Sequence, residues 1–270
     1  MRKKRTLLMF VLLLILTSIT ASGYELDKEK NGKRISGSFN TRFASKHIWR
    51  GFNQFKDKGA VQPSLNLDWF GTGFSSTIWS CWSFSDGNED QEEIDYVTAY
   101  SNSLFNDSNW KMNYTINWIY YDYPHTASKD KDAQEIGMNF SWPKLLTIGS
   151  RPLVPSYYVG KLWPAQSNAN NSACGGWVHI LGLGYDVPVA NLFTVGQEQL
   201  IHLSAELVYN DGMGGKTVDH DWSHCVFGIS TDIPFGVLIL KPELNYQISM
   251  DDSVNKSNEF WCALNVLYKF

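Results

Sequence analysis

Charged side chains recur at even spacings in this sequence, which places them on one face of an extended chain. Arg42 and Arg50 are related in this way, and so are Lys241 and Glu243. Residues at even spacing point to the same side of a β-strand. Charges that face one another across an enclosed space either select passing ions or pair and brace the fold. Both interpretations stay open. The candidate acidic partners of Arg50 are Asp68, Glu93 and Asp95.

The densest group of side chains that can ligate a metal is Asp219, His220, Asp221 and His224. Carboxylate and imidazole groups this close can bind a divalent ion. The segment is a glycine-rich loop, however, and acids in such loops are usually solvated, so we predict no metal site. No helical pattern follows Gly182 and Gly184, so this pair is not a dinucleotide-binding motif. We therefore expect no cofactor.

The elements that would position the charges are β-strands. Apolar and polar residues alternate along most of the chain after residue 34, which is the strand signal. Leu244 and Tyr246, for example, share one face, and Asn245 and Gln247 share the other. The alternation predicts about twelve strands, an even number within the range of bacterial barrels. Their predicted ranges are 35–50, 60–70, 74–84, 92–102, 110–121, 132–142, 151–161, 177–187, 199–210, 223–233, 237–249 and 259–270.

The connections between these ranges alternate between short and long. The short, turn-like ones include 70–73, 106–109 and 234–236, whereas 188–198 is long for a turn. The longer polar ones are 51–59, 85–91, 122–131, 162–176, 211–222 and 250–258. Outer-membrane barrels have short periplasmic turns and long outer loops. The sequence thus predicts an all-β protein, a single antiparallel transmembrane β-barrel over 35–270, with both termini on the periplasmic side.

The first 23 residues differ from the rest. Four basic residues at positions 2–5 precede an apolar run over 7–16, and small residues follow at 21–23. This order is typical of a secretory signal peptide, and the run is shorter than the roughly 20 residues of a transmembrane helix. We predict a signal peptide over 1–23, a flexible periplasmic lead-in over 24–34, and a location in the bacterial outer membrane.

The charge of the exported chain argues against nucleic acid as a partner. The whole sequence holds 23 Lys and Arg and 27 Asp and Glu. Without the four basic residues of 1–23, 19 basic residues face 27 acidic ones, a net charge of −8. Nucleic-acid-binding domains usually carry a basic face. We expect no nucleic-acid partner.

Four cysteines are widely and irregularly spaced in this exported chain: Cys81, Cys174, Cys225 and Cys262. Export permits disulfides, but the chain has none of the closely paired cysteines of a zinc or redox site. Free thiols and a disulfide both remain open.

Aromatic residues make up 14 % of the sequence. Tryptophan and tyrosine prefer the level of the lipid headgroups. We interpret six of them as interface girdles in preference to a path for ligand stacking: Trp49, Trp69, Trp110, Trp118, Trp142 and Tyr268. Trp79 falls on the opposite face, so we expect it to point into the lumen.

The last predicted strand alternates apolar residues and stops at Phe270. A final strand of this kind, which closes on an aromatic residue, resembles the assembly signal of bacterial outer-membrane proteins. Phe270 is therefore the candidate signal for the barrel-assembly machinery.

A family resemblance is carried by the stretch from Arg34 to about Ser85. The matching residues are Trp49-Arg50-Gly51, Gln54, Ala60-Val61-Gln62, Leu67-Asp68-Trp69, Gly73-Phe74 and Trp79. This stretch resembles the TorF-type porin family, whose members look like exported barrels with a Trp-Arg-Gly sequence at the top of the first strand. It departs from that pattern at Ser80-Cys81-Trp82, where small or polar residues are expected. The resemblance implies a porin without an established substrate.

We predict an outer-membrane, porin-like channel for passive passage of small solutes or ions. The predicted pore-lining residues are Arg42, Arg50, Asp68, Trp79, Asp95, His202, Glu206, Lys241 and Glu243. A plugged structural or adhesive barrel is the first alternative, because about twelve strands lie between filled and open barrels. A lipid-modifying barrel enzyme is the second, and it needs a hydrogen-bonded His and Ser on the lipid-facing wall. His202 and Ser204 fall on the predicted inner face, so we predict no catalytic residues.

Overall fold

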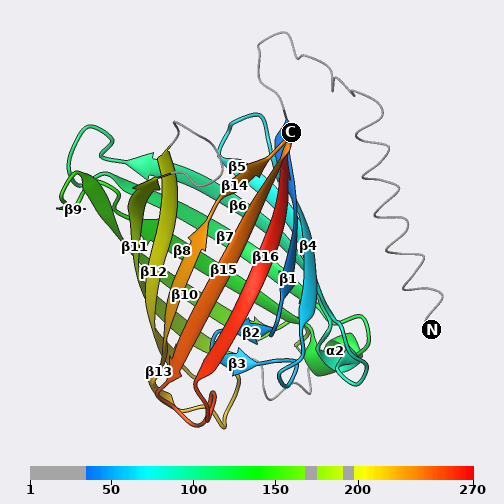
Figure 1. Ribbon diagram of the computed structural model, residues 1–270. Coiled ribbons are helices and arrows are strands. Elements are labelled where there is room, and N and C mark those ends of the chain that lie inside the picture. Colours follow the sequence, from blue (N-terminus) through cyan, green and yellow to red (C-terminus); the bar gives the residue numbers. More distant parts are fainter. Residues whose placement is uncertain (1–34, 168–174, 191–197) are drawn as a thin grey trace. The chain divides into compact units, whose positions relative to one another are not determined.

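The computed structural model describes residues 35–167, 175–190 and 198–270. Over these ranges the chain forms a closed barrel of twelve antiparallel strands (Figure 1), and the predicted all-β barrel is confirmed. The predicted signal peptide (1–23), the predicted lead-in (24–34) and Cys174 lie outside the described residues.

The twelve barrel strands are neighbours in chain order, and each is paired on both sides. They are β1 (Ser36–Ala44), β4 (Ala60–Asp68), β5 (Phe74–Ser83), β6 (Glu93–Leu104), β7 (Met112–Asp122), β8 (Ala133–Ser141), β10 (Arg151–Pro164), β11 (Gly176–Ala190), β12 (Glu198–Asp211), β13 (His220–Thr231), β15 (Leu238–Ser249) and β16 (Glu259–Lys269).

Six shorter elements accompany the barrel strands. They are the hairpin β2 (Ile48–Trp49) and β3 (Phe52–Asn53), the 3-10 helix η1 (Glu89–Gln91), the helix α2 (Ser128–Lys131), and the short strands β9 (Leu146–Ile148) and β14 (Ile233–Phe235). Neither helix in the described ranges could span a bilayer, since η1 and α2 contain three and four residues.

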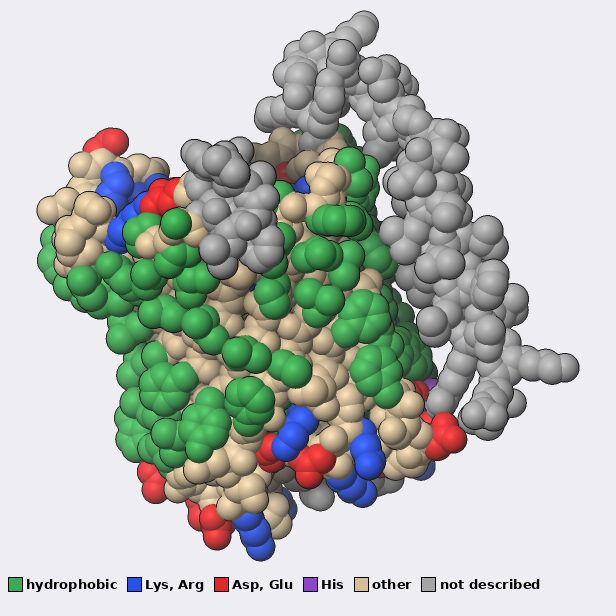
Figure 2. Space-filling view, in the orientation of Figure 1, with side chains coloured by type: hydrophobic (Ala, Val, Ile, Leu, Met, Phe, Trp, Pro, Cys, Tyr) green, Lys and Arg blue, Asp and Glu red, His purple; other side chains and the backbone are tan. Residues whose placement is uncertain are grey.

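The alternation of the sequence gives the barrel an apolar outer face and a polar inner one. On β15, Leu244 and Tyr246 expose 49 % and 42 % of their surface, whereas Gln247 next to them is fully buried. Figure 2 shows hydrophobic side chains over much of the barrel wall and charged side chains near its ends. Such a band of outward apolar side chains is what contact with lipid tails requires.

The barrel closes between its first and last strands. Phe43 and Leu264 are paired across β1 and β16. At the end of this pair the backbone nitrogen of Gly37 donates to the carbonyl of Phe270 at 2.8 Å, and the return bond measures 3.0 Å. The last residue of the chain therefore takes part in the closing hydrogen bonds.

The two ends of the barrel carry different connections. We call the end that holds the C-terminus the turn end; it carries short connections such as 69–73 and 232–237. The opposite, loop end carries 45–59, 84–92, 123–132, 212–219 and 250–258. Figure 1 shows the C-terminus at the top and α2, β2 and β3 at the opposite end. The predicted segment 188–198 partly belongs to β11 and β12, which extend to Ala190 and from Glu198.

The first connection differs from the prediction. The strand predicted over 35–50 ends at Ala44, and residues 45–59, which we call the inner loop, fold into the lumen. The chain reverses at Arg50 and Gly51, whose φ angles of 48° and 92° are left-handed and incompatible with a continuing strand. Farther along, Phe55 is fully buried against Cys81. The sequence over 45–50 contains neither glycine nor proline, so it gave no sign of this reversal.

Candidate functional site

The candidate site is the lumen, where the inner loop meets the inward side chains of the wall. Arg50, at the tip of this loop, is held by Glu135 of β8. The two guanidinium nitrogens donate to Glu135 Oε1 at 2.6 Å and to Oε2 at 2.8 Å. Tyr121 donates to Oε2 at 2.9 Å, and Tyr158 also donates to this carboxylate. Two parallel bonds fix the orientation of an arginine as well as its position.

The other side of the loop tip is anchored across the barrel. The carbonyl of Gly51 accepts hydrogen bonds from Gln247 Nε2 at 3.1 Å and from Asn255 Nδ2 at 3.0 Å. Gln247 lies on β15, and Asn255 lies in the connection from β15 to β16. These strands lie across the ring from β8, which carries Glu135. The tip of the inner loop therefore spans the lumen from wall to wall.

Gly51 is required by both conformation and space. Its φ of 92° is a left-handed value that glycine adopts without steric cost. A Cβ at this position would lie 2.7 Å from His224 Nδ1 and from a methyl group of Val254. The loop tip is therefore in close contact with β13 and with the 250–258 connection.

Two more basic residues of the inner loop pair with acids of the wall. Lys46 Nζ lies 2.7 Å from Glu259 Oε2 on β16 and 2.6 Å from Asp57 Oδ1 within the loop. His47 Nδ1 accepts from the Gln62 amide at 3.0 Å, and its Nε2 lies 3.6 Å from Glu93 Oε1 on β6. Together with the Arg50 pair, these contacts bind the loop to four strands, which are β4, β6, β8 and β16.

The pairing of Lys46 and Asp57 stabilises the charged form of both groups. The hydrogen bonds that Lys46 donates to Asp57 and Glu259 raise the pKa of Lys46. The same bond from Lys46, with one from Asn53, lowers the pKa of Asp57. The base of the loop is thus held by charged groups over the physiological pH range.

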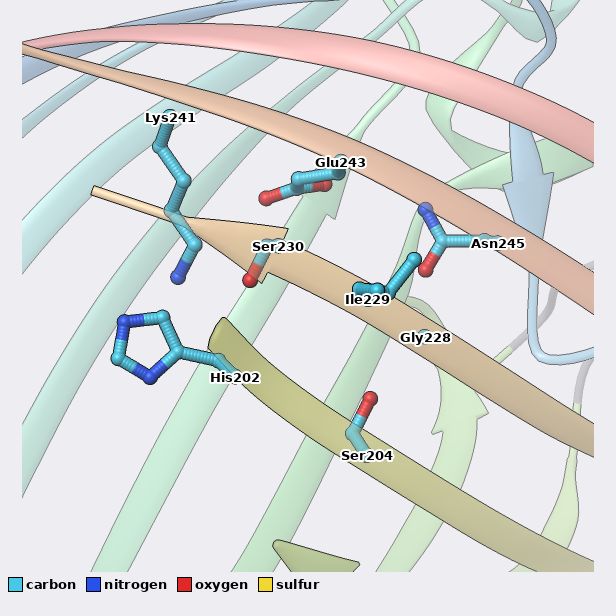
Figure 3. A pocket seen from close by; sticks show the side chains of 8 residues that line it. All are labelled: His202, Ser204, Gly228, Ile229, Ser230, Lys241, Glu243 and Asn245. Carbon is cyan, nitrogen blue, oxygen red and sulfur yellow. The ribbon is translucent and has the colours of Figure 1, made fainter. Parts of the chain in front are cut away.

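Nearer the turn end, a second polar group lies beside a pocket. Arg42 donates to Glu243 Oε2 at 3.2 Å and to Gln62 Oε1 at 2.9 Å. Asn265 donates to the other oxygen of Glu243 at 2.7 Å. The pocket has a volume of about 260 Å³, and Figure 3 shows its lining: His202, Ser204, Gly228, Ile229, Ser230, Lys241, Glu243 and Asn245.

Most of the predicted lumen residues face inward. Arg42, His202, Lys241 and Glu243 contact one another or line the pocket. Glu206 shares the strand face of His202 and Ser204. Trp79 packs beside Phe55, and Asp95 is paired with Trp79 across β5 and β6. Asp68 differs from these residues, because its carboxylate contacts a turn at the end of the barrel. It accepts a hydrogen bond from the backbone nitrogen of Gly71 at 2.8 Å. Whether these side chains touch a solute is a matter for the proposal below.

The structure departs from the sequence interpretation in the partner of Arg50 and in the place of Trp49. The expected partners were Asp68, Glu93 and Asp95, but the ion pair is made with Glu135. Glu135 stands at an inward position of its strand, yet no local pattern indicates which of many inward acids meets a distant arginine.

Trp49 was expected in an interface girdle. It lies instead in β2, on the inside, edge-on to Tyr121 with ring centroids 6.1 Å apart. The ring also lies 4.9 Å from the Arg50 guanidinium carbon. The physical reason is the reversal at Arg50 and Gly51, which carries Trp49 into the lumen.

The other five girdle candidates lie on the outer face or at its rim. Trp69, Trp110, Trp142 and Tyr268 are near the turn end, and Trp118 is nearer the loop end. The sequence interpretation missed Trp177 and Trp222, which are 40 % and 39 % exposed near the loop end. Trp177 lies under the Lys161 ammonium at 4.9 Å. Aromatic rings thus lie near both ends of the apolar wall.

His179 of β11 bears on the lipid-modifying alternative, which needs a histidine on the lipid-facing wall. The structure places it on the outer face, where Nδ1 lies 2.7 Å from the Tyr157 hydroxyl. A tyrosine is thus its hydrogen-bond partner, whereas the lipid-modifying alternative called for a serine. His202 and Ser204 line the pocket inside.

Within the described residues, the cysteines and the candidate metal ligands do not form one cluster. Cys81, Cys225 and Cys262 are free thiols. His220 pairs with Asp211, and His224 is buried beside Ser223. Across the three described ranges, no group of three or more His, Cys, Asp or Glu side chains is arranged to hold a metal ion.

Comparison with known proteins gives the fold. The sequence matches no known family and no curated protein. Among solved structures, the KdgM porin is 11 % identical, with a TM-score of 0.50 over 86 % of this chain and 99 % of that one. An outer-membrane channel from Pseudomonas putida F1 is 10 % identical, with a TM-score of 0.50 over 91 % and 100 %. The NanC porin is 10 % identical, with a TM-score of 0.48 over 88 % and 100 %.

The likenesses to the KdgM porin and the Pseudomonas putida channel define the class of fold. The chain has the fold of a twelve-stranded, porin-like β-barrel. The finer resemblance to TorF-type porins stays a prediction, since no family match bears on it.

Proposed function

We propose that this chain is an outer-membrane channel for passive passage of small polar solutes or ions, and that the inner loop sets its narrowest point. The observation that carries the proposal is a lumen lined by Arg42, Lys241, Glu243 and other polar side chains within a wall that is apolar outside. Charged side chains inside a barrel favour water and ions over lipid.

Three features support the proposed location in the outer membrane. The apolar wall is bordered by aromatic rings near both ends, as in outer-membrane barrels. The 1–23 segment has the pattern of a signal peptide. The KdgM porin and the Pseudomonas putida channel share the fold. Because outer-membrane barrels have short periplasmic turns and long outer loops, the loop end faces the outside of the cell and the turn end faces the periplasm. The barrel-assembly machinery would engage the last strand at the periplasmic side.

The inner loop restricts the path near the outside. Its tip reaches from Gln247 to Glu135 across the lumen, so solutes must pass beside it or displace it. The pairs made by Lys46, His47 and Arg50 hold the loop in place. Channel size is therefore governed by these pairs and not by strand number alone.

The same loop supports a second candidate, the plugged structural barrel. A segment that joins opposite walls and buries Phe55 completely is also what a permanent plug requires. The two candidates differ in one property, which is whether the native barrel conducts.

Conductance in planar bilayers separates them. The native chain is compared with a variant in which 46–58 is replaced by Asn-Gly, a turn that suits the direct pairing of Ala44 with Ala60. We expect small unitary currents from the native barrel and several-fold larger ones from the variant. The variant should also prefer cations, because Glu93, Glu135 and Glu259 lose their basic partners. The matched control is Arg151→Gln, which removes an exposed ion pair with Glu198 and should change neither property.

Two outcomes contradict the channel. If neither barrel conducts after correct assembly, judged by altered gel mobility before boiling, the pore proposal fails. If only the shortened variant conducts, the native protein is a plugged barrel.

A further inference from the structure

The pocket in the wall of the lumen lies toward the turn end, on three adjacent strands. His202 and Ser204 come from β12, Gly228 and Ser230 from β13, and Lys241 from β15. Figure 3 shows the side chains of Lys241, Ser230 and His202 pointing toward one another. The pocket is therefore built by inward side chains on strands, which are more rigid than loops.

Two carboxylates near this pocket already have hydrogen-bond partners. Glu243 accepts from Arg42 at 3.2 Å through one oxygen and from Asn265 at 2.7 Å through the other. Asp186, the neighbouring acid on β11, lies 2.7 Å from His202 Nδ1. Both carboxylates are therefore paired within the wall, and Asp232 Oδ2 lies 4.0 Å from the other ring nitrogen of His202.

The donors, in contrast, have capacity left. Within the described ranges, the Lys241 ammonium has no ion pair and no hydrogen bond. The amide nitrogen of Asn245 is buried and lacks a hydrogen-bond partner among the same residues. Buried donors without partners cost free energy, and an acceptor-rich ligand would remove that cost. The groups of the site that lack partners are therefore hydrogen-bond donors. One of them, the Lys241 ammonium, carries a full positive charge.

The space for a ligand depends on Gly228. A Cβ at this position would lie 2.4 Å from Ser204 Oγ and 3.1 Å from Asn245 Oδ1. Any larger residue would narrow the pocket between β12 and β15. The serine hydroxyl can rotate away, so Gly228→Ala is compatible with the fold and fills space without changing charge.

We infer that this pocket is a binding subsite for a small carboxylate or phosphate anion, held by Lys241 with Ser230 and Asn245. It is a step on the solute path and rests on the proposed function. Glu206 lies two residues beyond Ser204 on the same strand face, toward the loop end. Its carboxylate disfavours an anion there and confines it to the Lys241 end of the pocket.

Direct binding to the folded barrel in detergent tests the subsite, with succinate and inorganic phosphate as separate probes in isothermal titration calorimetry. We expect the native barrel to bind at least one of them. Lys241→Gln should weaken that binding about tenfold or more, since a charge-assisted bond is lost. Gly228→Ala should weaken it through lost space. Lys161→Gln, which removes an outward lysine beside Trp177, is the control and should leave the affinity unchanged.

The outcomes distinguish the subsite from the channel. Absence of binding by both probes, or equal affinity of the native barrel and Lys241→Gln, overturns the subsite. A barrel that conducts in bilayers but fails this binding test is still a channel. One that binds with the expected variant pattern but does not conduct keeps the subsite and loses the transport.

Discussion

Arg50 is the residue on which the position of the inner loop depends most. Its partner Glu135 is fully buried and also accepts from Tyr121 and Tyr158. An arginine in this setting keeps its charge and its planar fork of donors. Removing the arginine would leave a buried carboxylate with two neutral donors only.

We predict that Arg50→Gln destabilises the assembled barrel by roughly 3–5 kcal/mol at most, the usual cost of breaking a buried ion pair. Urea unfolding in lipid vesicles measures the change in the free energy of unfolding. Water that enters the lumen and hydrates Glu135 would make this change smaller. Glu135→Gln should be costly too, and the double variant should cost less than the sum of the two.

The control for this pair is Arg151→Gln at the turn end. Arg151 and Glu198 are 31 % and 51 % exposed in their side chains, and exposed pairs contribute about 0–1 kcal/mol. Equal costs for Arg50→Gln and Arg151→Gln would show that the inner loop does not depend on the Arg50 pair.

At the scale of elements, the loop-end connections support one another. Lys131 of α2 donates to the backbone carbonyl of Asp90 and to Gln91 Oε1 at 2.7 Å, and it lies 4.2 Å above the Tyr123 ring. Burial lowers the pKa of Lys131 to about 8, although Asp90 and Glu93 act in the opposite direction. One lysine thus joins α2 to η1.

We predict that Lys131 titrates near pH 8 in the assembled barrel, which nuclear magnetic resonance of ¹³C-methylated lysine can measure. Because its pKa is lower in the folded protein than the ordinary 10.5, deprotonation favours the folded state. The contact between α2 and η1 should therefore gain stability as the pH rises from about 8 to 10.5. Asp90→Asn should move the midpoint lower, since that acid raises it. A midpoint near 10.5 would contradict the burial of this amine.

The strands were predictable from sequence because a wall between lipid and water demands a period of two. Leu244 and Tyr246 against Asn245 and Gln247 already displayed it. The inner loop was not, because 45–50 contains neither glycine nor proline, although Arg50 and Gly51 turn the chain back. A Trp-Arg-Gly sequence carries no local sign that its arginine will meet a glutamate from a distant strand.

The inward position of Arg42, Lys241 and Glu243 could also be predicted, since each shares a face with other polar residues. Their pairing could not. Glu243 meets Arg42 only because β1 and β15 both flank β16 in the closed ring. The pocket joins inward residues of β12, β13 and β15. The alternation within one strand gives their inward direction but not which of them lie side by side.

For the whole molecule, closure between β1 and β16 is the decisive contact. Phe270 exchanges two backbone hydrogen bonds with Gly37, and a Cβ on Gly37 would lie 2.7 Å from the Phe270 ring. The Phe270 ring thus lies against the first strand, one residue beyond the end of β16.

We predict that deletion of Phe270 sharply lowers the amount of assembled barrel while export continues. The reason is that the closing pair loses both hydrogen bonds, which leaves the backbone N–H and C=O groups of Gly37 without these partners. Gel mobility before and after boiling, on isolated outer membranes, measures the assembled fraction. Phe270→Tyr keeps the ring and the backbone and should assemble normally. Normal levels of the deletion variant would contradict the role of this residue.

The wall-to-wall position of the inner loop has a consequence for the order of folding. The loop follows the first strand, yet Arg50 and Glu135 are 85 residues apart, and Gly51 and Gln247 are 196 apart. Contacts between such distant residues form late, since long loops must close first. The first loop to be made is then the last to find its place. We expect that a newly formed barrel passes through a stage at which its lumen is wider than in the native protein, and that this stage ends when the loop docks.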